Sequence, residues 1–208
     1  MELKQRLRLW ADELHAIANE GLHWSGDNPH NERRFRRVVR IAAEILAAQD
    51  MRDADTIERI YTQNLAHTAA YPGGDAAIFD QEGKILLIQR KDNQLWAMPG
   101  GMLEVGETPA EGTCREAWEE TGMAVEPLAL VGVYDSRLAG SVTSAHLYQF
   151  VFLCRPRDPS AQPIVTHETL DVGWYAETEL PPLSPGHVRR VPDAFRYWRG
   201  EVRGAVFH

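Results

Sequence analysis

The sequence predicts an α/β fold, in which a mixed sheet lies between layers of helices and follows a small N-terminal helical domain. Residues 1–67 carry apolar side chains at helical spacing, whereas residues 68–208 contain several short runs with the alternation typical of strands. One helix with an acidic face interrupts those strands. Strands and helices that alternate in this way are typical of an α/β sandwich.

Length, composition and charge limit the kind of protein. The chain has 208 residues, of which 44% are hydrophobic and 25% charged, as in an ordinary globular protein with a real core. Its 22 basic and 30 acidic residues give a net charge of −8, which argues against a nucleic-acid partner. No apolar run is long enough for a membrane span, and the charged N-terminus is unlike a signal peptide. Two cysteines, Cys114 and Cys154, form no disulfide framework, so we expect a cytoplasmic location.

The helical domain begins with an apolar stripe at alternating intervals of four and three residues, Leu3, Leu7, Trp10, Leu14 and Ile17. Gly21 is expected to end this helix, and residues 22–32 are rich in turn formers. The next helix carries apolar residues on one side, Phe35, Val38, Ile41, Ala42 and Ile45. A third is expected over residues 54–65. These apolar stripes must be buried from water, and either the second domain or a symmetry-related copy could pack against them.

Five arginines crowd the start of the second helix, Arg33, Arg34, Arg36, Arg37 and Arg40. Such a run commonly forms a solvated flank with salt bridges to nearby acidic residues. The alternative is that part of the cluster contacts substrate phosphates or a second subunit. Both interpretations stay open at this point.

From Tyr71 onward the pattern indicates strands. Residues 76–80 and 84–90 are expected to form a hairpin around the turn at 81–83, and residues 95–98 a short extended piece. The alternation in residues 125–137 and 144–156 predicts two long strands, and that in residues 168–176 predicts another. Residues 178–185 predict a turn with a short helix, and 187–201 a terminal helix.

The acidic helix has a clear beginning and end. Thr108 is a hydroxyl N-cap, Pro109 occupies the first helical position, and Glu111 completes a capping box. Gly122 is the expected stop. The terminal signals therefore place a helix over about residues 109–121.

One face of that helix gathers Glu116, Glu119 and Glu120, at i, i+3 and i+4. Apolar or small residues fall on or near the other face, Ala110, Cys114, Ala117 and Trp118. Like charges at this spacing repel, and Arg115 can neutralise only one of them. A solvated charged face is the ordinary alternative, but oxygen-only ligands in this density suit Mg²⁺ or Mn²⁺. No paired His or Cys spacing indicates zinc.

The wider pattern resembles the signature of the Nudix hydrolases at every fixed position: Gly101, Glu107, Arg115-Glu116-Ala117, Glu119-Glu120 and Gly122-Met123. The resemblance implies hydrolysis of a phosphoanhydride with Mg²⁺ or Mn²⁺. It implies that Glu116 and Glu120 are metal ligands, that Glu119 shares this work, and that the Gly101 carbonyl completes the shell. Glu107 and Arg115 are then mainly architectural, with the arginine holding a glutamate in place.

The same resemblance offers candidates for the general base and for phosphate binding. The base is either a glutamate of the signature or a residue of the loop at 167–174, where Glu168 is the first choice and His167 the second. Arg90 stands where the family commonly presents a cation to phosphate. A surface ion pair is the alternative for Arg90.

The chain as a whole resembles a narrower group of Nudix hydrolases, the CDP-choline pyrophosphatases and related enzymes for X-linked nucleoside diphosphates. Residues 9–46, 96–101 and 167–184 carry this resemblance. It implies a homodimer that cleaves CDP-choline, ADP-ribose or a similar compound to a nucleoside monophosphate and a phosphorylated X. Asp75 is a departure, because the group commonly has a basic residue there, and this puts CDP-choline in doubt.

Two other functions remain open. One is a hydrolase that sanitises nucleoside triphosphates or processes RNA ends, and RNA would require a basic groove such as the arginine cluster. The other is a regulatory module that binds nucleotides without turnover, which the intact set of glutamates does not favour. Aromatic residues that could stack on a nucleobase, or pack in the core, are Trp24, Tyr71, Phe79 and Tyr134.

Overall fold

The computed structural model describes residues 3–24, 28–48, 53–64, 70–136 and 147–207. It divides into two compact units, Met1–Ala69 and Ala70–His208. The domain boundary predicted at residue 67 lies outside the described residues. None of the described helices combines the length and apolar character that crossing a lipid bilayer requires.

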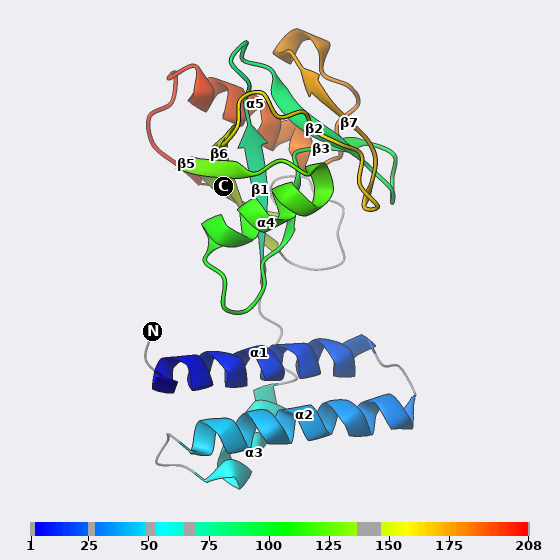
Figure 1. Cartoon of the computed structure of the whole chain (residues 1–208), viewed down its shortest axis with the longest axis vertical. Helices are drawn as coiled ribbons and strands as arrows, with labels where there is room; N and C mark the ends of the chain where they lie inside the picture. Colours follow the sequence, from blue (N-terminus) through cyan, green and yellow to red (C-terminus); the bar gives the residue numbers. More distant parts are fainter. Residues whose placement is uncertain (1–2, 25–27, 49–52, 65–69, 137–146, 208) are drawn as a thin grey trace. The chain divides into compact units, whose positions relative to one another are not determined.

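The described residues of the first unit form three helices, α1 (Leu3–Trp24), α2 (Pro29–Ala47) and α3 (Ala54–Asn64) (Figure 1). Asn28 caps α2, since its Oδ1 accepts a hydrogen bond from His30 N at 3.0 Å. Their shared core is small, and its buried members are Ala11, Ala18, Val39, Ala42, Ala43, Leu46, Ile57 and Tyr61. The third predicted helix is therefore present, although Leu65 lies outside the described residues.

Gly21 does not end α1, so that prediction is wrong. The helix continues to Trp24. A Cβ at Gly21 would lie 2.2 Å from Cε1 of Phe35, so the glycine makes room for the Phe35 ring of α2. Here the missing side chain serves close helix packing, not helix termination.

The apolar stripe predicted for α1 is buried along one edge only. Leu14 packs against the core that α1 shares with α2, together with Ala11 and Ala18. Trp10 and Ile17 lie along the other edge of the same stripe and are exposed. The two alanines allow close packing against α2, which turns the large side chains outward.

The described contacts of the arginine cluster on α2 are made inside this unit. Arg40 binds Glu44 at 2.9 Å and Glu58 at 2.8 Å, and it also contacts Asp55. Arg36 pairs with Glu32 at 2.9 Å. These contacts favour the interpretation of a solvated, salt-bridged flank.

In the second unit, residues 70–136 and 147–207 form two sheets and two α-helices. The five-stranded sheet has the order β4-β1-β6-β5-β8, and the three-stranded sheet has the order β3-β2-β7. The strands are β1 (Tyr71–Ile78), β2 (Ile85–Arg90), β3 (Trp96–Ala97), β4 (Gly100–Met102), β5 (Val125–Asp135), β6 (Leu147–Pro156), β7 (Thr169–Tyr175) and β8 (Val206–Phe207). The helices are α4 (Pro109–Thr121), the 3₁₀ turn η1 (Glu177–Glu179) and α5 (His187–Trp198).

The predicted hairpin of residues 76–90 is wrong, since β1 and β2 belong to different sheets. Only an isolated bridge, Phe79 to Ile85, joins them. The reason is that β1 already has hydrogen-bonded neighbours on both sides, β4 and β6. Six successive residues of β1 are buried, as expected of a central strand.

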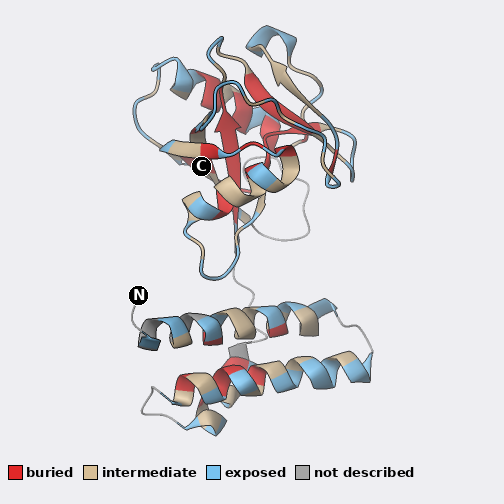
Figure 2. Cartoon of the chain, viewed as in Figure 1, coloured by how far each residue is buried: buried red, intermediate tan, exposed pale blue. Residues whose placement is uncertain are grey.

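Helices cover both faces of the larger sheet, which confirms the α/β sandwich with a mixed sheet. On one face, Ala76 and Ile78 share a buried cluster with Ala117 of α4. On the other face, Ala77 packs in the cluster that contains Phe195 of α5. Figure 2 shows the buried strands between these helices.

The predicted ends of α4 are confirmed. Thr108 and Glu111 form the capping box, and Gly122 adopts the left-handed conformation with φ of 69°. Trp118, however, was expected near the apolar side and is 60% exposed. The side chains that α4 buries include Thr113, Ala117 and Thr121, because these lie directly over the sheet.

Candidate active site

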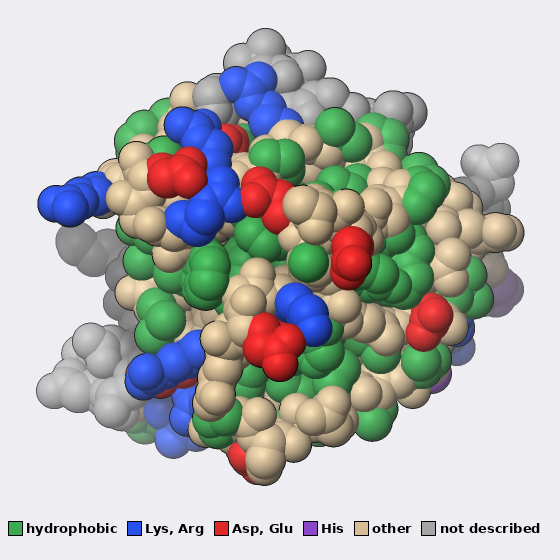
Figure 3. Space-filling view, turned by 90° about the horizontal axis from the view of Figure 1, so that it is seen from above, with side chains coloured by type: hydrophobic (Ala, Val, Ile, Leu, Met, Phe, Trp, Pro, Cys, Tyr) green, Lys and Arg blue, Asp and Glu red, His purple; other side chains and the backbone are tan. Residues whose placement is uncertain are grey.

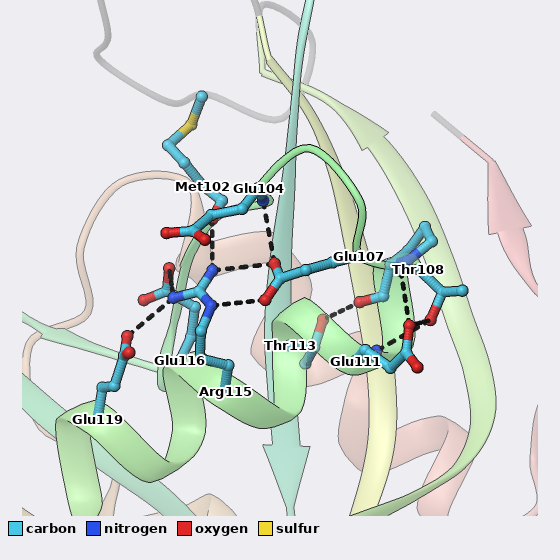
Figure 4. Close-up of polar contacts among 10 residues, drawn as sticks. Met102, Glu104, Glu107, Thr108, Glu111, Thr113, Arg115, Glu116 and Glu119 are labelled. Carbon is cyan, nitrogen blue, oxygen red and sulfur yellow. Dashed lines mark hydrogen bonds and ion pairs between the residues drawn. The ribbon is translucent and has the colours of Figure 1, made fainter. Parts of the chain in front are cut away.

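Arg115 of α4 contacts three carboxylates at once (Figure 4). Its Nε donates to Glu107 Oε1 at 2.7 Å, and its Nη1 donates to Glu116 Oε1 at 2.9 Å and to Glu119 Oε2 at 2.8 Å. Its Nη2 binds the Met102 carbonyl of β4 at 3.1 Å. The structure thus brings four of the predicted residues together and ties α4 to β4 through one guanidinium.

Glu116 lies against the backbone of β4. A Cβ at Gly101 would be 2.6 Å from the Glu116 carboxyl group, so only glycine leaves the carboxylate this close to the strand. Burial raises the pKa of Glu116, while the bond to Arg115 opposes that shift. The side chain is therefore a partly desolvated carboxylate against the backbone of Gly101.

Glu120 is held one residue earlier on the same strand. Its Oε2 accepts a hydrogen bond from Gly100 N at 2.7 Å. Burial raises the pKa of Glu120 to about 8, and the negative charge of Glu116 contributes. Burial therefore destabilises the ionised carboxylate of both Glu116 and Glu120.

This donor set fits a hard divalent cation. Two carboxylates and a glycine carbonyl are oxygen ligands of the kind that Mg²⁺ and Mn²⁺ prefer, and a cation would stabilise the ionised form of each partly buried carboxylate. Among the described residues, no three His, Cys, Asp or Glu side chains form a ready-made metal site. Arg115 supplies the positive charge beside Glu116 and Glu119 instead.

The loop that contains Glu168 is anchored to the end of α4. The hydroxyl groups of Thr166 and Thr169 both lie 3.4 Å from the Glu120 carbonyl oxygen and donate to it. The Glu168 side chain is partly exposed and lies 3.2 Å from His167 Nε2. Its charge also raises the pKa of Glu116, so it lies within electrostatic reach of the glutamate cluster.

Arg90 ends β2 and forms a fork with Asp92, at 2.9 Å from Nε to Oδ1 and 2.7 Å from Nη2 to Oδ2. Its positive charge also reaches Glu120, whose raised pKa it partly lowers. The structure therefore places Arg90 near the glutamate cluster and in an ion pair, so the two interpretations of this residue are compatible.

Sequence reasoning missed a buried ion pair beside β4. Arg190 of α5 donates from Nη1 to Asp75 Oδ2 at 2.6 Å, with side chains 4% and 3% exposed. Asp75 of β1 pairs in register with Gly100 of β4, whose N–H donates to Glu120. The ion pair therefore lies next to the strand that binds Glu120. The unusual acidic residue at position 75 has its own cation, and the two are 115 residues apart in sequence.

The aromatic candidates for base stacking are mostly structural. Phe79 packs edge-on against Phe195, and Tyr134 is fully buried and donates to Asp193 Oδ2 at 3.1 Å. Trp24 belongs to the helical unit and is 77% exposed. Tyr71 is half-exposed at the start of β1 and is the remaining candidate of this set in the second unit.

Two family models match the chain. The one described as the NUDIX domain matches residues 72–194, and the one described as a UDP-X-like, N-terminal oligomerisation domain matches residues 5–61. The signature at residues 101–123 falls within the first match, and residues 9–46 fall within the second.

Individual proteins are similar over most of the chain. YjhB of Bacillus subtilis (strain 168), provisionally named an ADP-ribose pyrophosphatase, is 31% identical over 84% of this chain and 83% of its own length. The crystal structure of a UDP-X diphosphatase covers 99% of both chains, with a TM-score of 0.62 and 24% identity. That of an ADP-ribose pyrophosphatase from Streptococcus suis 89-1591 covers 67% of this chain and 100% of its own, with a TM-score of 0.58 and 26% identity.

Proposed function

The chain belongs to the Nudix hydrolase family, and we propose that it is a pyrophosphohydrolase, dependent on Mg²⁺ or Mn²⁺, that cleaves X-linked nucleoside diphosphates. The observation that carries the proposal is the pair of partly buried carboxylates, Glu116 and Glu120, against the backbone of Gly100 and Gly101. Glu116, Glu120 and the Gly101 carbonyl would hold the metal, and Glu119 would share this role.

The reaction adds water across the phosphoanhydride. A divalent cation held by Glu116 and Glu120 would polarise phosphate oxygens and lower the pKa of water. The oxygen of water forms a bond to one phosphorus, the bridging P–O bond breaks, and the products are a nucleoside monophosphate and a phosphorylated X. Because charge neutralisation and positioning dominate such reactions, a rigid carboxylate cluster is well suited to it.

Arg115 and Glu107 position this cluster. By binding Glu107, Glu116 and Glu119 together, the guanidinium fixes the rotamers of side chains that would otherwise repel each other. We assign Arg115 and Glu107 this supporting role and no direct contact with the reacting atoms.

Glu168 is the proposed general base. It lies on the loop anchored to Glu120 and interacts electrostatically with Glu116, so it is close to where an attacking water would be held. The proton of water passes to its carboxylate as the new P–O bond forms. Glu119 and Glu120 are the alternatives within the helix.

Arg90 is the proposed substrate-binding residue. It supplies positive charge beside a cluster of acidic groups, which favours binding of a diphosphate. Arg90→Lys keeps the charge but loses the planar fork, and we expect KM to rise about tenfold with little change in kcat. In the control, Asp92→Asn frees Arg90 from its ion pair and should leave KM unchanged or lower. An Arg90→Lys enzyme with unchanged KM contradicts the assignment.

ADP-ribose-type compounds are the best-supported substrates. Two of the proteins compared above are named ADP-ribose pyrophosphatases. CDP-choline is the second test compound, since the helical unit resembles that of the CDP-choline group. On the face shown in Figure 3, the described Lys and Arg side chains lie beside Asp and Glu side chains and form no broad basic area, which favours a small substrate over a nucleic acid.

The decisive experiment is a substrate panel read by phosphorus NMR. ADP-ribose, CDP-choline, nucleoside diphosphate sugars and dNTPs would each be incubated with Mg²⁺ and with Mn²⁺. We expect two monophosphate products from an X-linked nucleoside diphosphate. Inorganic pyrophosphate from a dNTP would instead support a triphosphate-sanitising enzyme, and no turnover of any compound would support a non-catalytic module.

A homodimer is the proposed assembly. Four large apolar residues of α1 are exposed at intervals of seven, Leu3, Trp10, Ile17 and Trp24. Seven residues are close to two helical turns, so these side chains form a continuous apolar seam that winds slowly around one side of α1. Because residues 5–61 match an oligomerisation domain, we propose that this seam packs against the helical unit of a second copy.

A further inference from the structure

The C-terminal end of α4 is capped by the segment that carries Glu168. The last carbonyl groups of a helix have no partner within the helix, so groups from outside must donate to them. Here the hydroxyls of Thr166 and Thr169 both donate to the Glu120 carbonyl, each at 3.4 Å. Residues 164–169 therefore bind the same turn of α4 that presents the Glu120 carboxylate.

The Thr166 hydroxyl makes a second hydrogen bond, and this one leads to Glu168. The N–H of Glu168 donates to Thr166 Oγ1 at 3.2 Å, while the hydroxyl gives its own hydrogen to the Glu120 carbonyl. A threonine hydroxyl has one hydrogen to donate and lone pairs that accept, so a single oxygen can make both bonds. Thr166 Oγ1 therefore joins the backbone of Glu168 directly to the backbone of Glu120.

Thr169 is the buried anchor of this segment. It is 3% exposed, begins β7 and pairs in register with Arg90 of β2. The register shifts at this point, which leaves Leu170 as the extra residue of a β-bulge. Thr169 Oγ1 also accepts a hydrogen bond from Thr166 N at 3.2 Å. The buried threonine thus holds the half-buried Thr166 in place.

The Glu168 side chain is held mainly through its backbone. Its carboxylate lies 3.2 Å from His167 Nε2, and the His167 side chain is 86% exposed. An exposed contact of this kind restrains a carboxylate weakly. The backbone is held better, because Lys91 donates to the His167 carbonyl and Thr166 accepts from Glu168 N. The place of the carboxylate therefore depends on these backbone contacts.

Such a link matters because a general base acts only within hydrogen-bond reach of the water that it deprotonates. The proposed base, Glu168, and the proposed metal ligand, Glu120, lie on separate segments of the chain. A displacement of about 1 Å between reacting groups can cost about 100-fold in rate. The Thr166 hydroxyl connects the two segments through one atom, so it is well placed to prevent that displacement.

We propose that Thr166 is a positioning residue, whose hydroxyl fixes the spacing between Glu168 and Glu120. Thr169 supports it by binding Thr166 N. The inference rests on the proposed function, because it requires Glu168 as the base and Glu120 as a metal ligand. It assigns part of the turnover rate to a side chain that contacts neither the metal nor the substrate.

The test combines three single variants with a double-mutant cycle. Thr166→Val keeps the shape of the side chain and removes the hydroxyl, whereas Thr166→Ser keeps the hydroxyl. Thr121→Val is the matched control, since it removes a buried hydroxyl at the same end of α4 that donates to the Ala117 carbonyl and accepts from Met123 N. The cycle adds Thr166→Val to Glu168→Gln. For each protein, kcat and KM would be measured on the nucleotide that the wild type cleaves best, and Mn²⁺ binding by calorimetry.

We expect Thr166→Val to lower kcat by about 10- to 100-fold, less than the loss of the base itself. Its KM, Mn²⁺ affinity and Mn²⁺ stoichiometry should match the wild type, which shows that the protein is folded and that the metal site is intact. Thr166→Ser should recover most of the rate, and Thr121→Val should retain the wild-type kcat. In the Glu168→Gln background, Thr166→Val should cause no further loss, because the residue through which it acts is already disabled.

Three results would overturn the inference: an unchanged kcat in Thr166→Val, a serine variant as slow as the valine variant, or losses that multiply in the double variant. Multiplying losses would show that Thr166 supports the fold without acting through Glu168. Failure of the proposed function is a different result, because the wild type itself would then cleave no X-linked nucleoside diphosphate.

Discussion

The guanidinium of Arg115 holds the carboxylate of Glu107 through two N–H groups, with Nε to Oε1 at 2.7 Å and Nη2 to Oε2 at 3.2 Å. Both side chains are largely buried, at 23% and 19% exposure. The hydrogen bond from Arg115 is the main reason that the pKa of Glu107 is lowered. The pair joins the loop before α4 to the middle of the helix and so fixes the platform for Glu116 and Glu119.

Glu107→Gln should therefore destabilise the protein. The variant keeps an acceptor but loses a charge-assisted, two-point contact, and we expect a loss of about 1–2 kcal/mol in the free energy of unfolding at pH 7. Glu126→Gln is the matched control, because Glu126 pairs with Arg155 at 2.7 Å on the surface. The control should change stability by less than about 0.5 kcal/mol. Equal losses in urea denaturation would contradict a structural role for Glu107.

Glu120→Gln should separate activity from folding. The amide can still accept the hydrogen bond from Gly100 N, so the unfolding midpoint in EDTA should not fall. Loss of a ligand charge should lower kcat by about 100-fold to 10,000-fold, since metal-ion catalysis is worth several kcal/mol. Calorimetric titration with Mn²⁺ should show weaker binding. Glu104→Gln, an exposed glutamate of the preceding loop, should match the wild type in both measurements, and a fully active Glu120→Gln would remove Glu120 from the ligand set.

Glu168→Gln should lower kcat by about 100-fold or more, the usual contribution of a positioned base. Its KM and its Mn²⁺ affinity should stay close to those of the wild type, because Glu168 is not a proposed ligand. His167→Gln, which alters the exposed neighbour of Glu168, serves as the comparison and should retain most activity. An unchanged rate in Glu168→Gln would return the role of base to Glu119 or Glu120.

Local interactions explain which parts of this fold were predictable. The limits of α4 follow from Thr108, Glu111 and Gly122, whose partners lie within a few residues, so the sequence alone specifies them. The clustering of Glu116 and Glu119 likewise follows from helix periodicity. The roles assigned to the individual glutamates stay predictions until the variants above are measured.

Contacts between distant residues explain what was missed. No local pattern joins Asp75 to Arg190, which are 115 residues apart, because α5 and β1 meet only when the sheet has formed. Glycine is the residue that most often ends a helix, so Gly21 was expected to end α1. Its actual role is to leave room for the ring of Phe35, which lies on the next helix. The separation of β1 from β2 into two sheets follows from the pairing of β1 with β6, which comes much later in the chain.

His187 should make stability depend on pH. It is buried at the start of α5, and its Nδ1 accepts a hydrogen bond from Met98 N at 3.2 Å. Burial, together with the positive charges of Arg190 and Arg90, holds the pKa of His187 well below its usual value. Below about pH 6.5 the unfolded chain binds a proton that the folded protein excludes, so stability falls as pH falls, by up to about 1.4 kcal/mol per unit.

The matched variant for this effect is His187→Asn, which retains a short acceptor for Met98 N and does not titrate. Between pH 6.5 and 5.5 the wild type should lose about 1 kcal/mol more stability than His187→Asn, measured by urea denaturation. Other titrating groups contribute equally to both proteins and cancel in the difference. Parallel losses in the two proteins would show that His187 becomes protonated within the folded state.

Ile17→Glu should dissociate the proposed dimer. Ile17 is 57% exposed on α1, between Trp10 and Trp24 of the apolar seam, and it makes no contribution to the core shared with α2. A carboxylate there would be buried without a partner in a dimer that packs on this seam, whereas the monomer would leave it in water. Light scattering after size exclusion should give a dimer for the wild type and a monomer for Ile17→Glu, with helical content unchanged by circular dichroism. Leu128→Glu, at a 49% exposed position of β5, is the control and should remain a dimer. If Ile17→Glu stays dimeric, the interface lies on another surface of the chain.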